Sequence, residues 1–291
     1  MRNYLLAATV APPQAATTEG LVFSKDATQA KPIQAEAKPA EAGSANPVFI
    51  FNDTFTNYYN PGVGLAGAAV LEAAGRSVSL APNGCCGRPL ISQGLLEEAR
   101  TRAAANAETL APLVERGGTI VFFEPSCLSA VKEDAPALLR GDLRRKAERV
   151  SQASELFESL AGRCFSGGQP LPVRQGPETI FLHGHCHQKA MGLVAPAKAL
   201  LSRIPGASVV DLDAGCCGMA GSFGYVRDHF EVSRTIGERR LLPAARQLGA
   251  NAVLVASGVS CRHQVEDFTG ARAWHPAELL SSLLPPTREP T

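Results

Sequence analysis

The sequence predicts an α/β fold built from two pseudo-repeated halves, each with a short, mostly parallel sheet flanked by helices. Short apolar runs such as 119–123 alternate with longer helix-prone segments, which is the pattern of strand–helix units. The order of elements occurs twice, and in each copy a Cys-Cys-Gly sequence, at residues 85–87 and 216–218, follows a strand. Hydrophobic residues make up 45% of the 291 residues, which is ample for a buried core.

Composition divides the chain into four parts. Residues 11–46 consist mainly of Ala, Pro, Gln, Thr, Lys and Glu, which bury too little apolar surface to offset the entropy of ordering. We therefore interpret residues 1–46 as a disordered leader or linker, of the kind that remains when a longer multidomain protein is divided. The first half is predicted at 47–165 and the second at 166–285, followed by a tail at 286–291.

The first half begins with a short β-rich run. Strands are predicted at 47–51, 76–80 and 119–123, and helices at 62–74, 90–116 and 142–160. Pro112 is expected to break or kink the second helix, because proline lacks the backbone N–H that the helix needs. A stretch rich in Gly, Pro and Gln at 162–177 marks the boundary between the halves.

The second half repeats this order of elements. Strands are predicted at 179–183, 207–212, 252–256 and 273–274, and helices at 188–203, along the segment that ends at 247, and at 277–284. Pro276 stands at a favourable first helical position of the last helix. In a sheet with right-handed crossovers, all strand-to-helix turns meet at one edge. Four cysteines that follow strands should therefore converge there: Cys186, Cys216, Cys217 and Cys261.

Charge and cysteine content exclude several classes of protein. The net charge is +1, with 28 basic and 27 acidic side chains, so nothing indicates binding to nucleic acid or to an anionic membrane surface. The early apolar run at residues 5–10 is too short to cross a bilayer. Eight cysteines are too sparse for a disulfide scaffold, and their clustering at motifs suits metal binding in a reducing cytoplasm.

The four cysteines of the second half are predicted to hold a [4Fe–4S] cluster. Four thiolates are the usual ligand set of such a cluster, and helix N-termini stabilise the anionic form of cysteine. Glycines at 215, 218, 221 and 258 allow the backbone to approach a bulky inorganic core. Adjacent cysteines can reach different irons of a cluster more easily than they can share one tetrahedral ion. This favours iron–sulfur over zinc.

The first half has a candidate second site with three cysteines, Cys85, Cys86 and Cys127. Asp53 and Thr54 stand at the exit of its first strand, where the second half has Cys186. Three thiolates are compatible with a cluster that has an oxygen ligand or an open iron, with a zinc ion, or with no metal. Cys164 has no counterpart in the repeat and is interpreted as a core residue.

Histidines accompany the cysteines of the second half. His183, His185 and His187 alternate around Cys186, and His263 follows the last cysteine by two residues. Each is a candidate ligand, hydrogen-bond donor to a cluster or proton carrier. The alternative for each is a structural role in capping the end of a strand and the start of a helix.

These motifs resemble the cysteine-rich CCG domain family, which includes the cysteine-rich subunit of heterodisulfide reductase, the iron–sulfur subunit of glycolate oxidase and lactate-utilisation proteins. The likeness is greatest to the C-terminal region of fused FAD-linked oxidases, and it covers residues 47–284. The phrases that carry it are 53–58 (DTFTNY), 85–94 (CCGRPLISQG), 124–127 (EPSC), 183–190 (HGHCHQKA), 215–225 (GCCGMAGSFGY) and 260–264 (SCRHQ). Each half of the family has a further cysteine where this chain has Glu124 and Gly258, and Thr54 replaces the leading cysteine of the first half. These departures disfavour a five-cysteine cluster.

The resemblance implies an iron–sulfur electron-transfer component of a flavin-dependent 2-hydroxy acid dehydrogenase of the lactate or glycolate type. It also implies partners that these 291 residues do not contain: a flavin-containing dehydrogenase chain or domain, which would hold the FAD, and a ferredoxin-like cluster protein. The expected location is the cytoplasm, or the periphery of the inner membrane through a partner. Two alternatives stay open: a thiol or disulfide reductase of the heterodisulfide reductase type, and a non-enzymatic scaffold stabilised by zinc.

Overall fold

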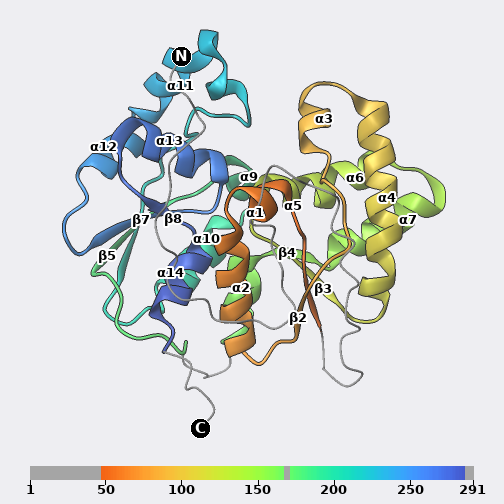
Figure 1. Cartoon of the computed structure of the whole chain (residues 1–291), viewed down its shortest axis with the longest axis horizontal. Coiled ribbons are helices and arrows are strands. Elements are labelled where there is room, and N and C mark those ends of the chain that lie inside the picture. Colours follow the sequence, from red (N-terminus) through yellow and green to blue (C-terminus); the bar gives the residue numbers. More distant parts are fainter. Residues whose placement is uncertain (1–46, 167–170, 286–291) are drawn as a thin grey trace.

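The computed structural model describes residues 47–166 and 171–285, and it contains two four-stranded sheets (Figure 1). Every strand pair in both sheets is parallel, and the strand orders are β2-β1-β3-β4 and β6-β5-β7-β8. The strands are β1 (Val48–Ile50), β2 (Val78–Leu80), β3 (Thr119–Phe122), β4 (Ser154–Leu156), β5 (Thr179–His183), β6 (Ser208–Asp211), β7 (Ala252–Ala256) and β8 (Ala273–Trp274). The two orders match position by position, which confirms the predicted α/β class with two repeated halves.

Helices flank both sheets and follow the strands closely. In the first half they are α1 (Thr54–Tyr58), α2 (Pro61–Ala73), α3 (Arg88–Ser92), α4 (Leu96–Glu115), α5 (Pro125–Ser129), α6 (Ala135–Leu138), α7 (Gly141–Gln152) and α8 (Phe157–Cys164). In the second half they are α9 (Cys186–Ala190), α10 (Val194–Leu201), α11 (Phe230–Gly237), α12 (Leu241–Arg246), α13 (Val259–Thr269) and α14 (Pro276–Leu283). A π-helical turn joins α5 to α6, and two 3-10 turns precede α11.

Four sequence predictions about the bounds of helices are wrong. The segment 90–116 is divided at Gly94, with φ +74°, into α3 and α4. The segment 142–160 is not one helix, because α7 ends at Gln152 and the chain then forms β4 and α8; pairing of β4 with β3 overrides the local helix preference. The segment 188–203 is divided by Gly192 at φ +70°, and the segment that ends at 247 is divided into turns, α11 and α12. The break expected at Pro112 does not occur, because α4 continues through it and burial of Leu110 and Leu113 offsets the lost hydrogen bond.

The two halves share one hydrophobic core. Buried residues of β1, such as Ile50, belong to the same cluster as Leu182 of β5 and Leu280 of α14. Helix α2 packs beside α14 (Figure 1). Helix α8 packs beside α10. Packing between the halves therefore fixes the edge of one sheet relative to the other. The predicted boundaries at 165 and 285 stay a prediction.

The carboxyl ends of the strands carry the turns that matter for function. Both Cys-Cys-Gly turns use glycine in the left-handed region, with φ +86° at Gly87 and +104° at Gly218. A side chain at Gly218 would also collide with the Ser233 carbonyl, 2.4 Å from its Cβ position. The predicted leader at 1–46 and tail at 286–291 lie outside the described residues.

Within the described part of the chain, every helix is too short or too polar to span a lipid bilayer.

Candidate metal centre

Four cysteines of the second half lie at the carboxyl edge of its sheet. Cys186 is the first residue of α9, directly after β5, and Cys261 lies in the first turn of α13, after β7. Cys216 and Cys217 occupy the turn after β6. Parallel pairing of β6, β5 and β7 brings these three exits to one edge.

The four sulfur atoms form a continuous set of contacts. Cys186 contacts Cys216, Cys216 contacts Cys217, and the Sγ atoms of Cys217 and Cys261 are 3.4 Å apart. Cys217 and Cys261 are buried, Cys216 is half-buried and Cys186 is exposed. The structure thus brings together all four cysteines that the sequence placed at this edge, and the set reaches from the interior to the surface.

His183 lies against the buried side of this set. A ring nitrogen of His183 and the Sγ atoms of Cys217 and Cys261 all lie within 4.8 Å of one another. The imidazole is 1% exposed, and neither of its nitrogens has an oxygen or nitrogen hydrogen-bond partner among the described residues. A buried polar ring without such a partner lowers the stability of the fold. The ring is therefore suited to coordinate a metal centre held by the thiols, or to donate a hydrogen bond to it.

The other three histidines predicted beside the cysteines have structural partners. His185 caps α9, because its Nδ1 accepts a hydrogen bond from the backbone N–H of His187 at 3.2 Å. Nδ1 of His187 lies 2.7 Å from Oγ of Ser129 in the first half, and Nδ1 of His263 lies 2.9 Å from the Tyr225 hydroxyl. The capping interpretation is therefore confirmed for His185, although its ring still lies 3.9 Å from the Cys186 sulfur.

Contacts within the second-half set lower the pKa of two thiols. Hydrogen bonds from Cys186 and Cys217 hold the pKa of Cys216 far below its usual range, and contact with Cys217, together with the nearby rings of His183 and His185, lowers the pKa of Cys261. Contact with Cys216 raises the pKa of both Cys186 and Cys217. Backbone N–H groups add stabilisation, with Gly218 N 3.3 Å from the Cys216 sulfur. These contacts favour the thiolate form at Cys216 and Cys261 over Cys186 and Cys217.

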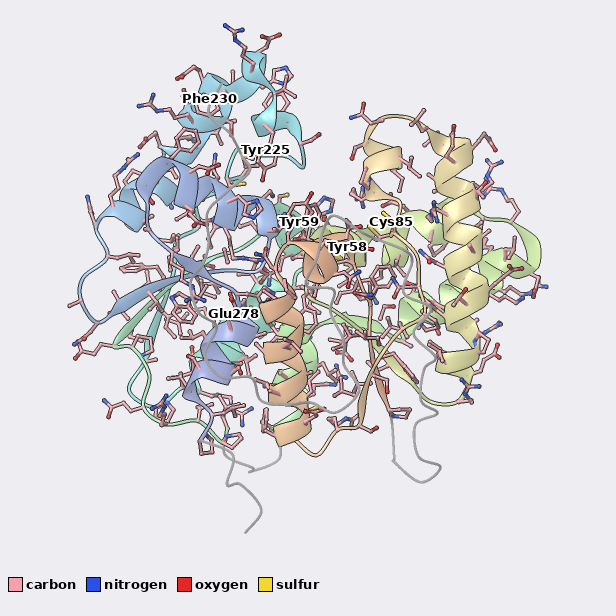
Figure 2. The ribbon with its side chains drawn as sticks, in the orientation of Figure 1. Tyr58, Tyr59, Cys85, Tyr225, Phe230 and Glu278 are labelled. Carbon is pink, nitrogen blue, oxygen red and sulfur yellow. The ribbon has the colours of Figure 1, made fainter. Side chains whose placement is uncertain are left out.

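The first half gathers three thiols in the corresponding place. The Sγ atoms of Cys86 and Cys127 are 3.1 Å apart, and Cys85 contacts both Cys86 and Thr54. Thr54 is the first residue of α1, as Cys186 is the first residue of α9. Figure 2 labels Cys85 at the edge of the sheet, on the side where α1 lies.

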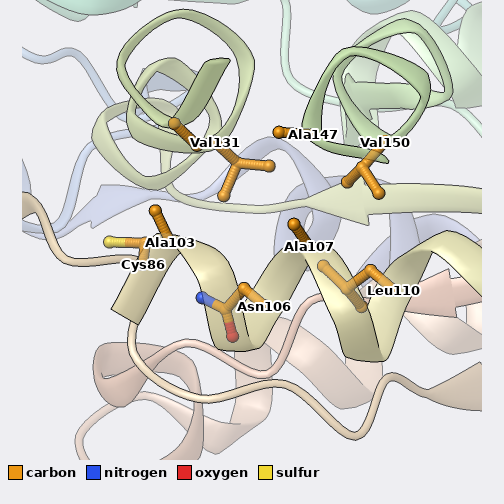
Figure 3. A pocket seen from close by; sticks show the side chains of 9 residues that line it. Cys86, Ala103, Asn106, Ala107, Leu110, Val131, Ala147 and Val150 are labelled. Carbon is orange, nitrogen blue, oxygen red and sulfur yellow. The ribbon is translucent and has the colours of Figure 1, made fainter. Parts of the chain in front are cut away.

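Asn106 of α4 fixes the first Cys-Cys-Gly turn. Its Oδ1 accepts from the N–H of Gly84 and its Nδ2 donates to the carbonyl of Cys85, both at 2.9 Å. Figure 3 shows Asn106 one turn along α4 from Ala103, which lies beside Cys86 around a small apolar cavity. Sequence reasoning missed Asn106, because its distance of about 20 residues from the cysteines gives no local signal.

Carboxylates dominate the surroundings of the first-half thiols. Contact with Cys86 lowers the pKa of Cys127, but burial and the nearby Asp53 and Glu124 outweigh it and raise the pKa to about 11. Contact with Cys86 and burial also raise the pKa of Cys85. Burial raises the pKa of Asp53 itself to about 6. The oxygens of Asp53 accept from two N–H groups and the Thr56 hydroxyl of α1, so they are engaged in capping.

The second half fits an iron–sulfur centre on three features of this structure. It supplies four thiols in a continuous series of contacts, two backbone N–H groups that donate to sulfur, and one buried imidazole without another polar partner among the described residues. These are the groups that hold and tune such clusters. Cys164, by contrast, is half-buried at the end of α8 and packs against the shared core, in agreement with its interpretation as a core residue.

Comparison with known proteins identifies the family. The model of the cysteine-rich domain, CCG, matches residues 52–132 and 180–266, one match in each half. The chain belongs to the CCG cysteine-rich domain family. Each match covers the exits of the first three strands of its half and the cysteines gathered there, whereas Cys164 lies outside both matches.

Relatives of this CCG chain include components of dehydrogenases. It is 31% identical over 249 residues to a subunit of the anaerobic glycerol-3-phosphate dehydrogenase of Escherichia coli (strain K12), covering 84% of this chain and 61% of the relative. It is 28% identical over 253 residues to the D-2-hydroxyglutarate dehydrogenase of the same strain, covering 86% of this chain and 24% of the relative. It is 24% identical over 208 residues to an uncharacterized iron–sulfur protein of Methanocaldococcus jannaschii, covering 71% and 38%. The chain thus spans between a quarter and three fifths of these relatives.

Proposed function

We propose that this chain is the iron–sulfur electron-transfer component of a flavin-dependent dehydrogenase, with Cys186, Cys216, Cys217 and Cys261 as ligands of a [4Fe–4S] cluster. The observation that carries the proposal is the contact set of four thiols at one sheet edge, backed by the ring of His183, which has no other polar partner among the described residues. Membership of the CCG family and likeness to an iron–sulfur protein support the metal.

The bound cluster would supply reversible one-electron transfer. The residues of the chain provide the conditions for it. Cys217 and Cys261 lie in the interior, where water is excluded, and the exposed Cys186 marks the shortest route between the centre and a partner. The N–H groups of Gly218 and Met219 donate to the sulfurs of Cys216 and Cys217, which stabilises their negative charge.

The proposed partners are a flavin-containing dehydrogenase chain or domain and a ferredoxin-like cluster protein. The relatives that support this act on glycerol-3-phosphate or D-2-hydroxyglutarate by name, and this chain matches only part of each. We infer that the flavin partner oxidises a hydroxy-bearing anionic substrate of this kind, including 2-hydroxy acids of the lactate or glycolate type. Exposed aromatic side chains such as Tyr59 and Tyr225 lie on segments that follow β1 and β6, where a partner could dock (Figure 2). The proposed location is the cytoplasm, including the inner-membrane periphery through a partner.

Anaerobic purification with metal and sulfide analysis tests the proposal. We expect about four irons and four sulfides per second-half centre, and a visible absorption that dithionite bleaches reversibly. The Cys164→Ser variant should keep both, because that thiol lies away from the set and serves as the matched control. A colourless protein that contains zinc alone would overturn the proposal. Turnover of small disulfides without any flavoprotein would favour the reductase alternative instead.

A further inference from the structure

The helices that carry the third cysteine of each half begin in the same way. Helix α5 starts after Glu124 and has Cys127 as its third residue, while α13 starts after Gly258 and has Cys261 as its third residue. Glu124 and Gly258 are therefore equivalent positions of the repeat. One has a long acidic side chain and the other has none.

The carboxylate of Glu124 reaches both helices. Its Oε1 accepts from the Ser126 backbone N–H at 3.2 Å and from the Ser126 hydroxyl at 2.8 Å, which caps α5. Its Oε2 accepts from the Val259 backbone N–H at 2.9 Å, across 135 residues of sequence, which caps α13 in the other half. The side chain is 5% exposed, so water does not compete for these bonds.

Helix α13 cannot cap itself with a side chain of its own. A Cβ atom at Gly258 would lie 2.1 Å from Cδ2 of His185, which is closer than atoms can approach. The ring of His185 is held there because it caps α9. The first N–H groups of any helix need acceptors from outside the helix. Here Glu124 provides the acceptor that Gly258 lacks.

We propose that Glu124 is a positioning residue shared by the two thiol groups, because one carboxylate fixes the start of both helices that bear a third cysteine. It holds Cys127 against Cys86 and Cys261 against Cys217 at the same time. Loss of this side chain should therefore release two buried cysteines that are 134 positions apart in the sequence. Only the effect on bound iron rests on the proposed function, since the hydrogen bonds are made by the protein alone.

Alkylation of the full chain, reduced and freed of metal, tests the sharing directly. In Glu124→Ala, the modification rates of Cys127 and Cys261, read by peptide mass spectrometry, should both rise by about tenfold, as expected when a buried backbone group loses a charge-assisted bond. Glu124→Gln keeps one acceptor oxygen and should raise the rate of at least one of them. Glu158→Gln is the matched control, because Glu158 is also a buried carboxylate between the halves but accepts from the side chains of Ser257 and Gln188 rather than from the N–H groups of α5 or α13.

Two outcomes would overturn the inference. If Cys127 alone becomes more reactive in Glu124→Ala, the carboxylate serves only its own helix. If neither variant at 124 differs from Glu158→Gln, it positions neither cysteine. A second measurement, the rate at which a chelator removes iron from the loaded chain, should rise by about tenfold in Glu124→Ala over Glu158→Gln. If the wild-type chain binds no iron, the proposed function fails while the alkylation result still decides the role of Glu124.

Discussion

The two halves of the molecule have the same fold but differ at the residues that surround their thiols. At the exit of the first strand, the second half has Cys186 where the first half has Thr54. Two residues before each helix cap, the second half has the buried His183 and the first half has Phe51, which stacks on Phe122 at 4.5 Å. The second half therefore has a fourth thiol and an imidazole where the first half has a hydroxyl and an apolar ring.

The ionisable side chains around the thiols also differ. Asp53 and Glu124 lie beside Cys127 and raise its pKa, whereas His183 and His185 lie beside Cys261 and help to lower its pKa. In both halves the thiols lie near helix N-termini that follow parallel strands. The backbone therefore does not account for the different thiol pKa shifts of the two halves. A repeated scaffold thus brings the sulfur atoms together, and a few neighbouring side chains decide which thiols favour the thiolate form.

Loss of one ligand in each half gives the largest expected contrast. Cys261→Ser should abolish iron binding, with a loss greater than the roughly 10- to 100-fold that follows removal of a group supporting a ligand. Cys127→Ser, at the equivalent position, should leave the iron of the second half in place. Iron content and visible absorption of the two variants measure this. Equal loss of iron in both would show that the halves hold one joint centre.

The ring of His183 gives the next contrast. His183→Phe makes the position like Phe51 and removes a ring nitrogen that lies within 4.8 Å of the sulfur atoms of Cys217 and Cys261. We expect iron affinity to fall roughly 10- to 100-fold, measured by competition with a chelator, because a buried partner of the ligands is lost. Cys164→Ser again serves as the control. An unchanged affinity would mean that His183 is only a core residue.

The sequence predicted the fold class and the gathering of the second-half cysteines, because both follow from strand order and from where parallel strands end. It did not predict β4, since the residues Ser154–Leu156 have no strong strand pattern and form a strand only by pairing with β3. Nor did it distinguish a ligand from a cap among the histidines. That distinction depends on which ring finds a backbone partner in three dimensions, as His185 does and, among the described residues, His183 does not.

The roles of Glu124 and Gly258 were equally beyond the sequence. The Glu-Pro pair at 124–125 is a helix-start signal, and it could have indicated a cap for α5. Nothing local indicates that the same carboxylate reaches Val259 in the other half. Contacts of this kind are set by how the two sheets pack, which no motif in either half encodes.

Acid should lower the free energy of unfolding through a histidine of the second half. Burial and the charge of Arg262 hold the pKa of His275 well below its usual range, while the equivalent position in the first half is the apolar Leu156. Folding therefore requires neutral His275, whose contribution is fully present above about pH 6.5 and is lost as pH falls below it. Between about pH 7.5 and 5.5, the free energy of unfolding should fall by about 1.4 kcal/mol more in the wild type than in His275→Asn. Urea titrations at the two pH values measure the difference, and parallel falls would contradict it.

Conversion of the first half into the second tests which residues limit iron binding in the first half. Thr54→Cys would supply the fourth thiol at the first residue of α1, next to Cys85. Thr54 is exposed, so the substitution should change stability by no more than about 0.5 kcal/mol. If ligand number limits the first half, the iron content per chain should rise up to about twofold over the wild type. If the iron content does not rise, the carboxylates of Asp53 and Glu124 limit iron binding in the first half. They oppose the thiolate form of Cys127 whatever the number of cysteines. The double variant Thr54→Cys with Asp53→Asn, which keeps an oxygen for the helix cap, then separates the two causes by the same iron measurement.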